Sequence, residues 1–162
     1  LFVCTGNSAR SIFAEAILRD LAPDRFDVYS AGTSPQPGLH PFALEMLVAK
    51  GHDVSTLRPK TLGEFQSPQA PRMDFIFTVC DRAANEECPT WPGQPVSAHW
   101  GMPDPAKFQG NVAERQLAFQ QVYGAVHNRI SAFASLPFHA LDRVSLQKSV
   151  DEIGRKTSTQ DH

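Results

Sequence analysis

The prediction of the fold rests on the first 21 residues, LFVCTGNSARSIFAEAILRDL (1–21). The apolar run at residues 1–3 predicts the inner end of a buried strand, and residues 4–10, which include Gly6 and Asn7, predict a loop. From Ser11 onward apolar residues recur every three or four positions, which predicts a helix with one buried face. The segment therefore reads as a strand, a loop and a helix in immediate succession.

The rest of the chain continues this alternation. Three further strands are predicted at residues 26–31, 73–79 and 95–99. Helices are predicted from Pro41 to Gly51, in a long segment containing Phe119 and Phe133, and at 141–153, with a short one at 62–65 in a proline-rich loop. Strands that alternate with helices in a chain of 162 residues predict an α/β fold, a three-layer sandwich with a four-stranded parallel sheet.

We expect one principal domain at residues 1–136, followed at 137–162 by a helix and tail that pack on it or fray from it, the frayed part being 157–162. In such sheets ligands bind beyond the carboxyl ends of the strands. Cys4, Cys80 and Asp104 all fall at or just after predicted strand ends. They are therefore the first candidates for a functional site.

Composition narrows the class of function. The net charge of -2 and the absence of clustered Lys and Arg argue against a nucleic-acid partner. No apolar run reaches the roughly 20 residues of a membrane span, and no export leader is recognised, so we expect a cytoplasmic protein with no membrane partner. An odd number of cysteines, three, favours reduced or catalytic thiols over a disulfide framework.

The loop CTGNSARS (4–11) has the features of an oxyanion site. Its backbone N–H groups and the start of the following helix can form a cradle for a tetrahedral oxyanion, to which Arg10 can present two donors. The same positive field should lower the pKa of Cys4, so that a thiolate near neutral pH acts as the nucleophile, with Ser11 donating to its sulfur. Gly6 and Asn7 tolerate the positive φ that a tight loop requires. The oxyanion-binding residues are expected to be Thr5, Gly6, Asn7, Ser8, Ala9 and Arg10; the alternative is that Cys4 is an inert core thiol.

The stretch VCTGNSARS resembles the signature loop of the low-molecular-weight protein tyrosine phosphatases and of the arsenate reductases that share their fold. The resemblance runs from Leu1 to about Phe133. It implies that Cys4 attacks the oxyanion and that Asp104, in the pair Asp104-Pro105, is the general acid. Without the loop, Asp104 would be read as a solvated turn residue.

Within this resemblance, arsenate reduction is favoured over phosphotyrosine hydrolysis. Ala106 stands where the phosphatases usually carry an aromatic platform, and Ala9 stands where they usually carry a second loop cysteine. The region around Cys80 and Cys88 resembles that of the arsenate reductases, which implies that Cys80 attacks Cys4, releases arsenite and is then attacked by Cys88. The spacing of these two cysteines is one residue longer than in the best-known relay proteins, which leaves open whether Cys88 or a small thiol resolves the intermediate.

The expected ligands are arsenate, with phosphate or sulfate as competing oxyanions, and the expected reductant is thioredoxin or glutaredoxin with glutathione. No cofactor is expected, and the histidines show no metal-ligand spacing, so no metal is expected either. Two alternatives remain. One is a low-molecular-weight protein tyrosine phosphatase that uses Cys4, Arg10 and Asp104; the other is a non-catalytic oxyanion sensor.

Overall fold

The structure is a computed structural model that describes residues 1–79 and 94–160, with side chains described up to Arg155. Its sheet has four parallel strands in the order β2-β1-β3-β4. The strands are β1 (Phe2–Cys4), β2 (Ser30–Gly32), β3 (Phe75–Thr78) and β4 (Val96–His99). The predicted α/β class with a four-stranded parallel sheet is confirmed.

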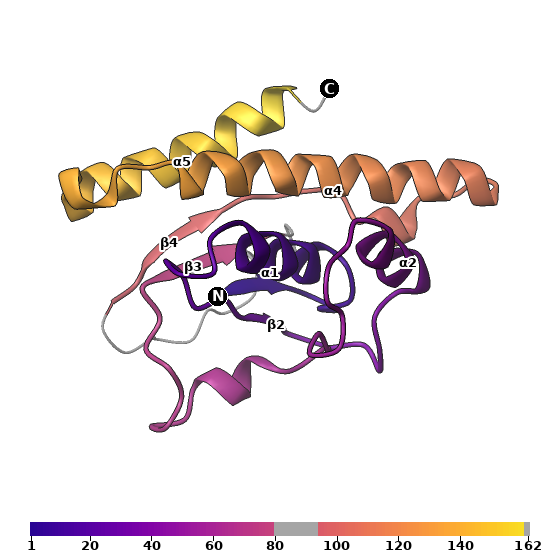
Figure 1. Cartoon of the computed structure of the whole chain (residues 1–162), viewed down its shortest axis with the longest axis horizontal. Helices are drawn as coiled ribbons and strands as arrows, with labels where there is room; N and C mark the ends of the chain where they lie inside the picture. Colours follow the sequence, from indigo (N-terminus) through magenta and orange to yellow (C-terminus); the bar gives the residue numbers. More distant parts are fainter. Residues whose placement is uncertain (80–93, 161–162) are drawn as a thin grey trace.

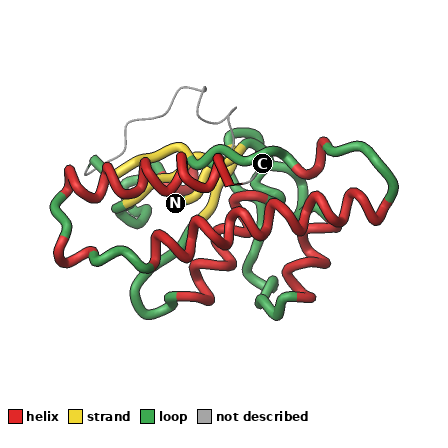
Figure 2. The backbone as a smooth tube through the Cα atoms, turned by 90° about the horizontal axis from the view of Figure 1, so that it is seen from above, coloured by secondary structure: helices red, strands yellow, loops and turns green. Residues whose placement is uncertain are grey.

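Helices alternate with these strands along the chain and lie alongside the sheet (Figures 1 and 2). The α-helices are α1 (Arg10–Leu21), α2 (Pro41–Ala49), α4 (Val112–Ala134) and α5 (Arg143–Gln160). Single turns of 3-10 helix occur at η1 (Leu62–Phe65), η2 (Pro105–Lys107) and η3 (Phe138–Ala140). Figure 1 shows α4 and α5 side by side above the sheet.

Two predicted elements differ from the structure at their ends. The strand predicted at 26–31 is shorter and ends one residue later, at Ser30–Gly32, and Phe26 packs against Phe133 at a ring-centroid distance of 5.3 Å. The last helix does not stop at Ile153 but continues to Gln160. A tail that frays at 157–162 stays a prediction. Residues 161–162 lie outside the described part of the chain.

An aromatic cluster joins the sheet to α4. Phe77 stacks on Trp100 with ring centroids 4.0 Å apart, and Phe133 presents its edge to Phe77 at 5.1 Å. All three side chains are at most 1% exposed. Burial of three large rings contributes several kcal/mol, about 2 for each, and fixes α4 against β3.

Helix α5 covers the end of β4. The indole N–H of Trp100 donates to the carbonyl of Val150 at 2.9 Å, and Gly154 passes so close that an added Cβ would lie 2.8 Å from the carbonyl oxygen of His99. The helix is thus packed on the sheet at Val150 and Gly154; a domain boundary at 136 stays a prediction. Among the described residues, no helix is both long enough and apolar enough to cross a membrane.

Candidate active site at the carboxyl ends of the strands

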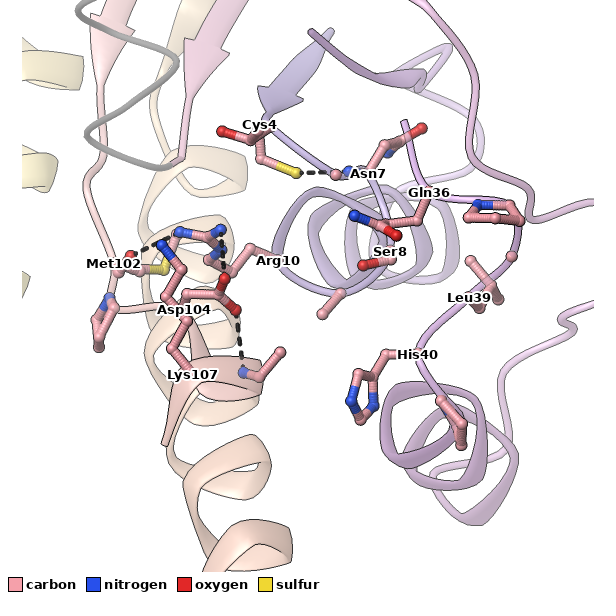
Figure 3. Close-up of a pocket in the computed structure, with 18 residues that line it drawn as sticks. Cys4, Asn7, Ser8, Arg10, Gln36, Leu39, His40, Met102, Asp104 and Lys107 are labelled. Carbon is pink, nitrogen blue, oxygen red and sulfur yellow. Dashed lines mark hydrogen bonds and ion pairs between the residues drawn. The ribbon is translucent and has the colours of Figure 1, made fainter. Parts of the chain in front are cut away.

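A cavity of about 770 Å³ opens beyond the carboxyl end of β1 (Figure 3). The register places Cys4 beside Gly32, at the ends of two adjacent strands. The cavity therefore lies where parallel sheets bind ligands. Its lining includes the whole loop from Cys4 to Arg10, the whole segment 36–41, and Met102, Pro103, Asp104, Ala106 and Lys107.

Cys4 lies at the floor of this cavity and is 2% exposed. The backbone N–H of Asn7 donates to its sulfur at 3.1 Å, and the hydroxyl oxygen of Ser11 lies 2.8 Å from the same sulfur. Both groups come from the turn that connects β1 to α1. The predicted contact of Ser11 with the nucleophilic sulfur is therefore present.

The predicted lowering of the Cys4 pKa is wrong for this arrangement of the pocket. Burial raises the pKa of the Cys4 thiol above its ordinary value, and the hydrogen bonds from Ser11 and Asn7 and the charge of Arg10, which lower it, do not offset the burial. The sequence suggested the stabilising groups but not how deeply the sulfur is buried.

Asn7 organises the loop. It adopts the left-handed conformation with φ of 49° and is fully buried. Its Nδ2 donates to the hydroxyl oxygens of Ser11 at 2.7 Å and Ser30 at 3.0 Å, while its Oδ1 accepts from the backbone N–H of Lys60 at 3.0 Å. The prediction of positive φ is confirmed for Asn7 but wrong for Gly6, which does not adopt it.

A buried carboxylate behind the loop was missed from the sequence. Ser30 donates to Glu15 Oε1 at 2.5 Å, and the ammonium of Lys60 lies 3.6 Å from the same oxygen. Because the hydroxyl of Ser30 donates its hydrogen bond to Glu15, its oxygen can accept one from Asn7. The missed signal was a charged residue among the buried positions of α1, with Arg19 one turn later as its second partner.

Arg10 and Asp104 meet at the side of the cavity formed by the loop after β4. Arg10 Nη2 lies 3.5 Å from Asp104 Oδ2, and Nη1 donates to the carbonyl of Met102 at 3.2 Å. Asp104 Oδ1 accepts from the backbone N–H of Ala106 at 3.0 Å, which fixes the carboxylate at the start of η2 (Figure 3). The structure thus brings Cys4, Arg10 and Asp104 to one cavity, and Ser11 lies buried behind the sulfur of Cys4.

His40 also lines the cavity, although the sequence gave no reason to choose it. Its Nδ1 accepts from the backbone N–H of Phe42, so it caps α2, and its ring packs on Phe119 at 4.6 Å. Burial and the charge of Arg115 lower the pKa of His40, against a smaller raising effect of Asp104. These effects disfavour the charged form of the His40 ring at the rim of the cavity.

Cys80 and Cys88, the predicted relay cysteines, lie outside the described residues. Within residues 1–79 and 94–160, no group of three His, Cys, Asp or Glu side chains is arranged to hold a metal ion. The chemistry that the described cavity supports is therefore that of one sulfur nucleophile, a guanidinium and a carboxylate around an oxyanion.

Comparison with known proteins identifies the family. Residues 1–150 match the family described as low molecular weight phosphotyrosine protein phosphatase. An arsenate reductase of Shouchella clausii is 38% identical over 133 residues, which is 82% of this chain and 92% of the relative.

Two solved structures are similar as well. A structure described as an arsenate reductase in the phosphate binding state is 27% identical, with a TM-score of 0.59, and the match covers 80% of this chain and 94% of that one. A thioredoxin-dependent arsenate reductase of Corynebacterium glutamicum is 26% identical, with a TM-score of 0.56, over 77% of this chain and 56% of that one. The chain therefore belongs to the low molecular weight phosphotyrosine protein phosphatase family and, within it, to the arsenate reductases.

Proposed function

We propose that this protein reduces arsenate to arsenite, with Cys4 as the nucleophile and Cys80 and Cys88 as the thiols that carry the oxidation away. The observation that carries the proposal is the position of the Cys4 sulfur, at the floor of a cavity and within hydrogen-bonding distance of Asn7 N and Ser11 Oγ. The 38% identity to an arsenate reductase supports it.

In the first step the Cys4 sulfur attacks arsenic and an As–O bond breaks, so that an S–As bond forms and one water leaves. A neutral thiol lowers the electrostatic cost of bringing an anion next to the sulfur. The thiol proton then passes to an oxygen of the arsenate dianion, which is the base closest to the attacking sulfur. Ser11 stabilises the sulfur whenever it carries negative charge.

Asp104 and Arg10 act on the oxygens. Asp104 is held near the cavity by the N–H of Ala106; once Arg10 turns to the anion, its carboxylate takes up the proton that the Cys4 thiol has released and passes it to the departing oxygen as general acid. Arg10 lies between Asp104 and the loop, so its fork can move from the carboxylate to two oxygens of the bound anion. Phosphate and sulfate share this tetrahedral shape and should compete for the site.

In the second step the Cys80 thiolate attacks the Cys4 sulfur and forms a disulfide. The S–As bond breaks, its electron pair stays on arsenic, and arsenic(V) becomes arsenic(III). Cys88 then attacks Cys80, which frees Cys4 and leaves a Cys80–Cys88 disulfide for an external dithiol to reduce. The similarity to a thioredoxin-dependent arsenate reductase supports thioredoxin as that reductant, with glutaredoxin and glutathione as the alternative. We place the cycle in the cytoplasm because free thiols persist there.

The second candidate is hydrolysis of phosphotyrosine, which the family name makes worth testing. Ala106 lines the cavity at the position where an aromatic platform would be needed. Phe108, two residues further, lines a neighbouring hollow together with Lys107 and Arg115. The cavity wall at this point thus favours a small inorganic oxyanion over an aryl phosphate.

Arsenite production should be measured for the wild-type protein and for Cys80→Ser and Cys88→Ser, with thioredoxin and glutaredoxin systems supplied separately. Hydrolysis of p-nitrophenyl phosphate by the same proteins serves as the matched control. We expect both substitutions to stop multiple turnover of arsenate and to leave ester hydrolysis unchanged, whereas Cys4→Ser should abolish both activities. Brisk ester hydrolysis with no arsenite from either reductant would replace this proposal with the phosphatase.

A further inference from the structure

A second segment, residues 33–40, runs along the outer side of the oxyanion loop and is hydrogen-bonded to it. Four backbone N–H groups of this segment donate to four backbone carbonyls of the loop, at distances between 2.9 and 3.1 Å. The pairs are Thr33 N to Cys4 O, Ser34 N to Thr5 O, Gln36 N to Gly6 O, and His40 N to Ser8 O.

These bonds determine which way the peptide planes of the loop face. In a trans peptide the carbonyl of one residue and the N–H of the next point in opposite directions. When the carbonyls of Cys4, Thr5 and Gly6 are held outward, the N–H groups that follow them are turned toward the cavity. One contact shows this directly, because the N–H that follows the Gly6 carbonyl is that of Asn7, which donates to the Cys4 sulfur at 3.1 Å.

The two segments also approach too closely for larger residues. A Cβ at Gly32 would lie 2.5 Å from the carbonyl oxygen of Thr5, and one at Gly6 would lie 3.1 Å from Cγ of Gln36. Glycine at these positions therefore allows the segment to lie against the loop at hydrogen-bonding distance.

We propose that the N–H groups of residues 33–40, above all those of Ser34 and Gln36, are positioning groups that set the affinity of the site for tetrahedral oxyanions. They do not touch the anion. They act through the loop carbonyls, so that several N–H groups converge before the anion arrives and no reorientation is needed when it binds. This inference concerns oxyanion binding and holds whether the bound anion is then reduced or hydrolysed.

The sequence of the segment suits this role. Ser34 precedes Pro35 and Gln36 precedes Pro37, and a residue before proline is restricted to extended conformations. The donors are consequently held in an extended chain with little freedom to lose when the pairs form.

Matched substitutions separate the backbone donor from the side chain. Gln36→Pro removes the N–H, whereas Gln36→Ala keeps it and removes only the side chain; Ser34→Pro and Ser34→Ala form a second, independent pair. Binding of inorganic phosphate should be measured by calorimetry, alongside thermal unfolding. We expect each proline variant to bind phosphate at least about tenfold more weakly than the wild type, because the N–H groups of the loop are no longer held toward the anion. Each alanine variant should stay within about twofold of the wild type.

Equal phosphate affinity in the proline and alanine variants would overturn the proposal, and so would a wild-type protein that does not bind phosphate. Hydrogen exchange in the unaltered protein covers the case in which the proline variants unfold. Phosphate should then slow exchange of the Ser34 and Gln36 amides, and exchange rates indifferent to phosphate would contradict the inference. A failure of arsenate reduction with the phosphate pattern intact would count against the proposed function alone.

Discussion

Replacing Asn7 by alanine should be the most damaging single change in the oxyanion loop. The side chain makes three hydrogen bonds, to Ser11, Ser30 and the backbone N–H of Lys60, and all are buried or partly buried. At about 1 kcal/mol for each bond, the loss is about 3 kcal/mol. Alanine at φ of 49° adds about 1 kcal/mol, because its Cβ disfavours the left-handed region. We therefore expect Asn7→Ala to lower the free energy of unfolding by about 4 kcal/mol.

Equilibrium unfolding in urea, followed by tryptophan fluorescence, measures this difference, and Asn7→Gly is the matched control. Glycine loses the same three bonds but accepts the left-handed conformation, so it should be about 1 kcal/mol more stable than the alanine variant. A cost below about 1 kcal/mol for Asn7→Ala, where three buried bonds are removed, would refute the role assigned to this side chain. So would a glycine variant less stable than the alanine variant.

Three further predictions concern other parts of the molecule. Because burial raises the pKa of Cys4, iodoacetamide should alkylate Cys4 more slowly at neutral pH than it alkylates free cysteine, as measured by mass spectrometry of the Cys4 peptide. The raised pKa also stabilises the folded protein below the ordinary thiol pKa, and this stabilisation is lost as pH rises through the pKa of the folded state. Fast alkylation at pH 7 would contradict both statements. Gly154→Ala should lower the melting temperature, since the added Cβ would lie 2.8 Å from the carbonyl oxygen of His99 in β4. Gly124→Ala adds its Cβ in open space on α4 and should raise the free energy of unfolding by up to about 1 kcal/mol. A change of stability with the same sign in both variants would count against close packing of α5. Glu15→Gln should lower the free energy of unfolding in urea by about 3 kcal/mol, because it leaves Lys60 without a buried counter-charge. Adding Lys60→Met to the same chain should recover part of that loss. Strictly additive effects of the two substitutions would show that the pair is not coupled.

The sequence predicted those parts of the site that are local in the chain. The run from Leu1 to Ser11 contains the strand end, the left-handed Asn7 and the helix start within a few residues, so these three features could be predicted from the local sequence. Asp104 was placed correctly because it follows a strand in a parallel sheet, where strand ends converge at one edge.

What was missed depends on contacts between distant segments. Lys60 comes from a stretch expected to be only a surface loop, yet its backbone and side chain reach Asn7 and Glu15. His40 reaches the cavity because α2 begins beside it, which no pattern of charge or hydrophobicity reveals. The direction of the Cys4 pKa was wrong for a related reason, because the field of the loop can be read from the residue types but the depth of burial cannot.

The pairing of Arg10 with Asp104 at 3.5 Å means that the guanidinium in the pocket is already paired with an anion that belongs to the protein. An incoming anion must displace the Asp104 carboxylate from Arg10. The measured affinity therefore reflects the difference in free energy between two anion contacts and not the strength of one. A halide ion meets the guanidinium at a single point and gains little over the carboxylate, whereas a tetrahedral oxyanion can offer two oxygens to the planar fork. Selectivity for shape can therefore arise from competition inside the pocket, without any narrowing of its entrance.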